Sequence, residues 1–192
     1  MASLFALVII FMIFICLCRK INRRRKFVFC SSFANFALMF EQNDSKNIAE
    51  QDKKFMRMAI DEARKALVEQ EVPIGAVVVC GGRVIGRGHN LVETLCDATA
   101  HAEMQSITAA ATTLGGKYLK GCTLYVTVEP CVMCAGALAW SQIDRVVYGA
   151  PDSKRGYTTV GGRIFHPKTE VVAGVLQEEC ETLMKDFFKT LR

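Results

Sequence analysis

Two short strings in this sequence constrain its fold more than any other feature. They are His101-Ala102-Glu103 and Pro130-Cys131-Val132-Met133-Cys134. Each string opens a helix-prone segment, and the second string follows directly on an apolar strand. Cys131 and Cys134 are three residues apart, so a helical turn places both on one face. The free N–H groups and the dipole at a helix N-terminus favour thiolates, which makes both cysteines candidate metal ligands.

His101, Cys131 and Cys134 together offer three ligands of the kinds that zinc accepts in tetrahedral geometry. A catalytic zinc site keeps its fourth position for water and lowers the pKa of that water to about 7. Glu103 is predicted to be the proton carrier, because a carboxylate beside such a water can take its proton and pass it on. Two alternatives stay open: no zinc at all, or a closed zinc site with a fourth protein ligand. Other cysteines of the body could supply that ligand, although buried small side chains are the simpler interpretation of them: Cys80, Cys96, Cys122 and Cys180.

The rest of the pattern predicts an α/β fold. Apolar residues recur at helical spacing from Asp52 and stop before Pro73. Two β-prone runs, 75–80 and 83–88, flank Gly81-Gly82 and predict a tight hairpin. Further strands are predicted at 123–128, 145–149 and 171–175, and further helices at 100–112, 131–141 and 177–191. Strands that alternate with helices favour a sandwich with at least partly parallel strand pairing.

The formal net charge of +5 is unevenly distributed over the chain. Residues 1–40 contain six basic and no acidic residues, whereas residues 41–192 contain 18 basic and 19 acidic residues. The overall charge is therefore no evidence for nucleic-acid binding by the body. The composition, with 51% hydrophobic and 22% charged residues, excludes a wholly disordered chain and a small disulfide scaffold.

The N-terminal segment, residues 1–40, is apolar and then basic. Residues 2–18 carry no charge, a length at the lower limit for a membrane span, and the basic residues follow at 19–26. Three interpretations stay open: a membrane anchor that leaves the rest of the chain in the cytosol, a targeting segment, or upstream sequence translated from a wrongly chosen start. In the last case Met39 is a plausible start, and residues 1–38 do not belong to the mature protein. Residues 41–51 are polar and predict a linker or a frayed helix entry, and residues 52–192 form the predicted domain.

Residues 52–192 resemble the bacterial tRNA-specific adenosine deaminases, the TadA family of the cytidine deaminase-like superfamily. The His-x-Glu and Pro-Cys-x-x-Cys strings specify only that wider superfamily of zinc deaminases. Other strings narrow the resemblance to the tRNA enzymes: Glu71-Val-Pro-Ile-Gly75, Gly88-His-Asn90, Thr99-Ala-His-Ala-Glu-Met104, Arg145-Val-Val-Tyr-Gly-Ala150, Asp152-Ser-Lys154 and Asp186-Phe-Phe188. The first forty residues have no counterpart in the family pattern.

The resemblance implies a fold, a reaction and partners. The fold is a three-layer α/β/α sandwich around a five-stranded mixed sheet, and the assembly is a homodimer with one Zn²⁺ per subunit. The reaction is the hydrolysis of adenosine to inosine at the wobble position of a tRNA anticodon. The usual bacterial substrate is an arginine tRNA, whose anticodon loop presents the base out of its stack. A thiolate metal site also fits a reducing compartment, so a cytoplasmic location is expected.

The resemblance also implies roles for individual residues around the base. Asn90 would hydrogen-bond the adenine with the backbone of Ala102 nearby, and Ile74 and Val128 would wall the base. Phe187 and Phe188 could stack on a base or brace a loop. Asn90 could equally be a turn residue that ends a strand, and the two Phe could close the core. Basic residues of the body are candidates for RNA contacts: Arg145, Lys154, Arg155, Arg163, Lys168, Lys185, Lys189 and Arg192.

Two rival functions are compatible with the same strings. A deaminase of free bases or nucleosides, such as guanine or cytosine, would share the zinc chemistry and need no RNA-binding surface. A zinc-stapled interaction module, tethered to a membrane if the N-terminal segment is an anchor, would carry no catalysis. Activity on an anticodon stem-loop, assayed against activity on free nucleosides, distinguishes a tRNA deaminase from the first rival. A fourth protein ligand on the zinc ion would favour the second rival.

Overall fold

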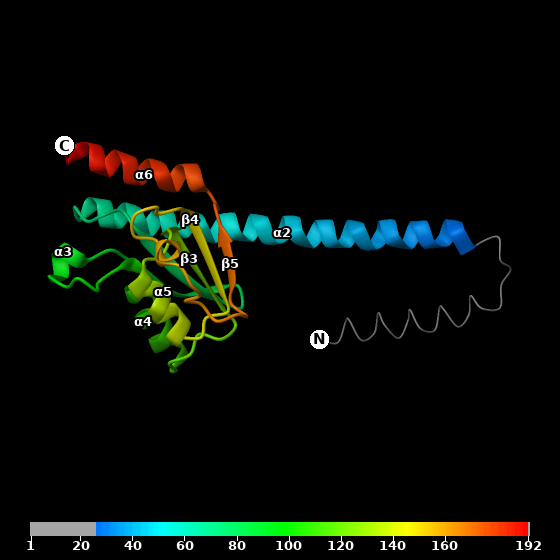
Figure 1. Ribbon diagram of the computed structural model, residues 1–192, viewed down its shortest axis with the longest axis horizontal. Coiled ribbons are helices and arrows are strands. Elements are labelled where there is room, and N and C mark those ends of the chain that lie inside the picture. Colours follow the sequence, from blue (N-terminus) through cyan, green and yellow to red (C-terminus); the bar gives the residue numbers. More distant parts are fainter. Residues whose placement is uncertain (1–25, 192) are drawn as a thin grey trace. The chain divides into compact units, whose positions relative to one another are not determined.

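The computed structural model describes the backbone of residues 26–191 and the side chains of residues 46–191 (Figure 1). The chain divides into two units, residues 1–48 and residues 49–192. The apolar stretch at residues 2–18 lies outside the described residues. Residues 41–51, predicted as a linker or a frayed helix entry, lie within the helix α2 (Lys26–Val68). Over residues 26–191, no helix is both long and apolar enough to cross a bilayer.

The second unit is built on a five-stranded sheet. Its strands are β1 (Gly75–Cys80), β2 (Arg83–His89), β3 (Cys122–Val128), β4 (Arg145–Ala150) and β5 (Glu170–Ala173), in the order β2-β1-β3-β4-β5. Strand β1 pairs antiparallel with β2 and β3, and β3, β4 and β5 are parallel. The predicted mixed sheet is confirmed. Because β3 and β4 are parallel, their C-terminal ends lie side by side at the same end of the strands.

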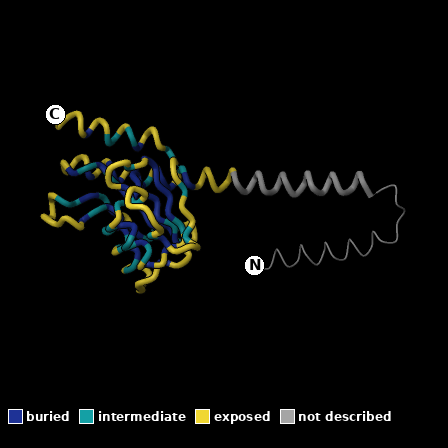
Figure 2. The backbone as a smooth tube through the Cα atoms, viewed as in Figure 1, coloured by how far each residue is buried: buried dark blue, intermediate teal, exposed yellow. Residues whose placement is uncertain are grey.

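Helices cover both faces of the sheet, because its central strands are apolar on both sides. In β1, Ala76 and Val78 belong to one buried cluster, and the alternating Val77 and Val79 belong to the other. The first cluster includes residues of α4 (Ala102–Leu114) and α5 (Val132–Trp140), and the second includes residues of α2 and α6 (Gln177–Thr190). The buried residues gather in the sheet and on the inner faces of the helices (Figure 2). The predicted three-layer α/β/α sandwich is thereby confirmed.

The other predicted elements are also confirmed with small shifts at their ends, whereas the helix predicted from Asp52 begins much earlier, at Lys26. Helix α4 begins at Ala102 and α5 at Val132, each after a residue in extended conformation. Two short elements were not predicted: α3 (Val92–Leu95) and the 3-10 helix η1 (Tyr157–Val160). Both have four residues, too few for a periodic apolar pattern to be read from the sequence.

Candidate metal centre and substrate site

Two helix N-termini position the candidate ligands. His101 is the N-cap of α4 and Cys131 is the N-cap of α5, while Cys134 lies in the first turn of α5 and is fully buried. Helix α4 packs closely on β2: a Cβ atom on Gly88 would lie 2.5 Å from the carbonyl oxygen of Ala102. A glycine is therefore required at this position of β2 for the start of α4, and hence His101, to sit where it does.

The donor atoms of the three candidate ligands converge. His Nδ1 and the two cysteine Sγ atoms all lie within 4.8 Å of one another. The Nδ1 atom of His101 is 3.6 Å from Sγ of Cys131 and 3.5 Å from Sγ of Cys134. In a tetrahedral zinc site, bond lengths of about 2.0 Å to nitrogen and 2.3 Å to sulfur place these atoms about 3.6 Å apart. The three residues therefore fit a zinc ion.

The surroundings favour a thiolate at Cys131. The hydrogen bond from Cys134 lowers the pKa of the Cys131 thiol to about 4, with further help from His101. The hydrogen bond to Cys131 in turn raises the pKa of His101. The pKa of Cys134 is raised, first by its hydrogen bond to Cys131 and then by burial. One sulfur of the pair is thus ready to bind a cation at neutral pH without first losing a proton.

Glu103 lies in the first turn of α4, next to the ligand cluster in sequence, and is only 3% exposed. Burial raises the pKa of its carboxyl to about 7, although its own backbone and the charge of His101 act in the opposite direction. A carboxyl group with a pKa near the working pH can both accept and donate a proton. Glu103 has no oxygen in the ligand cluster, so its position suits a proton carrier rather than a metal ligand.

A fourth protein ligand is not found in the described part of the chain. The cluster consists of His101, Cys131 and Cys134 alone. The other described cysteines are all free and lie outside this cluster: Cys80, Cys96, Cys122 and Cys180. Of these, Cys122 and Cys180 are buried, as expected for small apolar side chains. Three protein ligands with one open position are the pattern of a catalytic rather than a structural zinc site.

The residues expected around the base lie on segments that meet near this cluster. Ile74 directly precedes β1, and its carbonyl oxygen accepts a hydrogen bond of 3.0 Å from the backbone N–H of Asn90. Ala102 opens α4 and Val128 ends β3, and both are buried, at 0% and 5% exposure. Asn90 is buried as well, at 4%. A buried Asn is expected to have partners for its amide group, and its role toward the base stays a prediction.

Sequence reasoning missed the partner of Asn90. The amide nitrogen Nδ2 of Asn90 donates a hydrogen bond of 2.9 Å to Glu71, a fully buried residue whose other oxygen accepts one of 2.7 Å from the N–H of Thr94. Burial alone would raise the pKa of the Glu71 carboxyl, but the hydrogen bonds from Thr94 and Asn90 lower it below its usual value. Because a carboxylate only accepts hydrogen bonds, Glu71 fixes which end of the Asn90 amide faces it and leaves Oδ1 for another donor.

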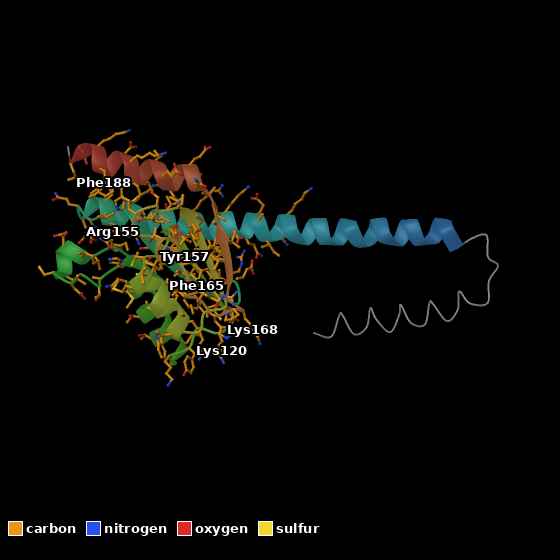
Figure 3. All side chains as sticks on the ribbon, viewed as in Figure 1. Lys120, Arg155, Tyr157, Phe165, Lys168 and Phe188 are labelled. Carbon is orange, nitrogen blue, oxygen red and sulfur yellow. The ribbon has the colours of Figure 1, made fainter. Side chains whose placement is uncertain are left out.

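The two phenylalanines of the C-terminal helix differ in exposure. Phe187 is 8% exposed, whereas Phe188 is 49% exposed, and their rings meet edge to face with centroids 5.3 Å apart. Phe187 therefore has the environment of a core residue, and Phe188 has a face free for stacking. Figure 3 places Phe188 and Arg155 at one end of the domain, and Lys120 and Lys168 at the other.

Arg145, a candidate for RNA contact, is engaged inside the fold instead. Its guanidinium forms two hydrogen bonds to the Asp52 carboxylate, of 2.6 and 2.8 Å, and lies 3.0 Å from Glu170. Tyr125 also donates a hydrogen bond of 2.9 Å to Asp52. With a side chain that is only 16% exposed, Arg145 links α2 to the sheet and has no free face for a phosphate.

Comparisons with known proteins agree with this geometry. Residues 49–150 match the family model of the cytidine and deoxycytidylate deaminase zinc-binding region. The tRNA-specific adenosine deaminase of Bacillus subtilis (strain 168) is 48% identical over 147 residues, which cover 74% of this chain and 91% of the relative. The chain belongs to the tRNA-specific adenosine deaminase family.

Other members of this family match over the same region. The tRNA-specific adenosine deaminase of Agrobacterium fabrum is 44% identical over 143 residues, covering 72% of this chain and 94% of the relative. A solved structure from studies of A-to-I editing by tRNA:A34 deaminases at the wobble position of transfer RNA aligns with a TM-score of 0.62. It is 43% identical and covers 68% of this chain and 98% of that structure.

Proposed function

We propose that this chain hydrolyses adenosine to inosine at the wobble position of a tRNA anticodon, with one zinc ion per subunit. The observation that carries the proposal is the convergence of His101, Cys131 and Cys134 with the buried Glu103 at the N-termini of two helices. Identity of 48% to a tRNA-specific adenosine deaminase supports the choice of substrate. The anticodon of an arginine tRNA is the proposed target.

The proposed mechanism assigns one task to each group of residues. His101, Cys131 and Cys134 would hold the zinc ion, which when bound supplies Lewis-acid activation of water at neutral pH. Glu103 takes the proton of the water that attacks C6 of the adenine and delivers it to N1. It then takes the proton of the new C6 hydroxyl and gives it to the departing amine, so that the bond between C6 and the exocyclic nitrogen breaks, the C6 oxygen becomes a carbonyl and ammonia leaves. The net reaction consumes one water and releases one ammonia, leaving inosine.

The remaining site residues bind and orient the base. An adenine taken out of its stack is read by hydrogen bonds to its edge and by apolar contact with its faces. Asn90, fixed by Glu71, offers Oδ1 as an acceptor to a donor group of the base. Ile74 and Val128 supply apolar contact, and Phe188 offers a half-exposed ring to a neighbouring base.

The proposal is tested by incubating the zinc-loaded protein with the anticodon stem-loop of an arginine tRNA. We expect inosine at the wobble position, measured by mass spectrometry of the digested RNA. A stem-loop with guanosine at that position is the matched control and should be unchanged. Deamination of free guanine, cytosine or adenosine without reaction of the stem-loop would contradict the proposal and favour a deaminase of free bases or nucleosides.

We also propose that the chain forms a homodimer through α5. This helix carries no polar side chain, yet Trp140 is 86% exposed and Val132 is 42% exposed. An exposed tryptophan on an apolar helix matches the aromatic anchors of protein interfaces. Trp140→Glu is expected to weaken dimerisation by at least about 30-fold, the effect of losing an anchor worth about 2 kcal/mol. Sedimentation across a concentration series measures this, and an unchanged dimer would contradict the assignment.

The proposed location of this domain is the cytoplasm. All six cysteines of residues 46–191, whose side chains the structure describes, are free, and two of them belong to the candidate metal site. Free thiols and thiolate ligands persist in reducing compartments. Membrane contact through residues 1–40 stays a prediction.

A further inference from the structure

Glu129 is a buried carboxylate that the proposed mechanism does not use. It directly precedes Pro130 and Cys131, between the end of β3 and the start of α5, and is 5% exposed. Its own N–H donates a hydrogen bond of 2.8 Å to the carbonyl oxygen of Ala150. Burying a carboxylate is unfavourable unless its oxygens are hydrogen-bonded, so its partners should account for its place.

The hydrogen-bond donors to the Glu129 carboxylate all come from one segment, residues 152–160, which follows β4 and ends with η1. One carboxylate oxygen accepts a hydrogen bond of 3.1 Å from the N–H of Asp152. The other oxygen accepts one of 3.1 Å from the N–H of Thr158 and one of 2.7 Å from its hydroxyl. The carboxylate thus fastens residues 152–160 at two points, six residues apart in the sequence.

The same segment is attached to the metal-ligand string itself. Gly156 forms an isolated β-bridge with Cys131, and the N–H of Tyr157 donates a hydrogen bond of 2.9 Å to the carbonyl oxygen of Pro130. The contact is too close for a side chain, because a Cβ atom on Gly156 would lie 2.4 Å from the carboxyl carbon of Glu129. Glu129 and Gly156 therefore pack directly against each other, and together they hold residues 152–160 against the ligand string Pro130–Cys134.

These contacts place Arg155 at the edge of the candidate site. Asp152 accepts hydrogen bonds of 2.9 and 3.0 Å from the N–H groups of Lys154 and Arg155, which shapes the turn before Gly156. Arg155 is exposed and adjoins the residue that pairs with Cys131. An exposed guanidinium so placed suits a phosphodiester next to the target nucleotide.

We propose that Glu129 is a positioning residue whose carboxylate fixes residues 152–160 against the metal-ligand string and thereby holds Arg155 where the RNA backbone enters the site. The inference rests on the proposed function for the identity of the substrate. It assigns Glu129 an effect on RNA binding and none on the chemical step.

The test compares Glu129→Gln with the parent protein by amide hydrogen exchange and by RNA binding. Gln keeps the size of the side chain but loses one acceptor, so the N–H of either Asp152 or Thr158 loses its partner. We expect exchange in the peptide covering residues 152–160 to become about tenfold faster, as for local opening. Zinc content and exchange in the helices α4 and α5 should not change.

Binding of the anticodon stem-loop is measured in the Glu103→Gln background, where RNA is bound without turnover. Glu129→Gln should raise Kd about tenfold and reduce the slope of log K against log salt by about 0.7, the value of one lost single-strand phosphate contact. Arg155→Ala should cause the same loss of slope. Arg83→Ala, which removes an exposed arginine at the turn between β1 and β2, is the matched control and should leave both quantities unchanged.

Thr158→Val is the milder second variant, because it removes only the hydroxyl donor and leaves the carboxylate and the backbone bonds. It should change exchange and Kd in the same direction by a smaller factor. Unchanged exchange over residues 152–160 in both variants would overturn the positioning role whether or not RNA binds. Loss of zinc with an unchanged salt slope would also overturn it and make Glu129 a support of the metal ligands. A parent protein that bound no stem-loop would instead contradict the proposed function.

Discussion

Glu103→Gln is expected to abolish deamination while leaving the metal site intact. The amide has the size of the carboxyl group but cannot carry a proton between water, ring nitrogen and departing amine. General acid–base catalysis contributes about 10²- to 10⁴-fold per step, and Glu103 is proposed to act in two steps, so we expect kcat to fall at least about 1,000-fold. Single-turnover inosine formation measures the loss, and elemental analysis measures zinc.

The structure provides a matched control for this variant. Glu178→Gln makes the same chemical change at an exposed position in the first turn of α6 and should leave both kcat and zinc content unchanged. Binding of the stem-loop by Glu103→Gln should stay within about threefold of the parent value, because the proposed contacts to the base come from other residues. A variant that still formed inosine at an undiminished rate would refute the proton-carrier role, whereas one without zinc would leave Glu103 as a structural support of the ligands.

The sequence was informative about this fold where the pattern is local. The alternation along β1, with Ala76 and Val78 on one face and Val77 and Val79 on the other, reflects a strand buried on both sides, and such a run is recognisable without any partner. The cluster of His101, Cys131 and Cys134 could also be predicted from the sequence, because two of its ligands are one helical turn apart and all three lie at helix starts.

The parts that could not be predicted depend on partners distant in the sequence. Glu71 and Glu129 accept hydrogen bonds from main-chain N–H groups. Because every residue except proline has such a group, the sequence does not show which residue is the donor. Arg145 was a candidate for RNA because it is basic, but its partner Asp52 lies 93 residues earlier. Charge alone does not distinguish an arginine that binds phosphate from one that ties a helix to a sheet.

Cys131→Ala is expected to remove the zinc ion and, with it, activity. The variant keeps only His101 and Cys134 of the cluster, and it loses the sulfur whose pKa of about 4 makes it a thiolate at neutral pH. The remaining thiol, Cys134, is buried, and because burial raises its pKa it has to give up a proton from an unfavourable position before it can bind a cation. We expect zinc affinity to fall at least about 1,000-fold, beyond the 10- to 100-fold typical of lost outer-shell partners.

Cys96→Ala separates ligation from the mere loss of a thiol, because Cys96 is exposed and lies outside the cluster. Elemental analysis should find one zinc per chain in Cys96→Ala and almost none in Cys131→Ala. Thermal unfolding gives an independent measure: a ligand that binds only the folded state stabilises it by RT ln(1 + [L]/Kd), so a chelator should lower Tm of the parent protein. The same chelator should leave Tm of Cys131→Ala unchanged, because no bound ion is left to remove. Full zinc occupancy in Cys131→Ala, or a Tm that still responds to the chelator, would exclude Cys131 as a ligand.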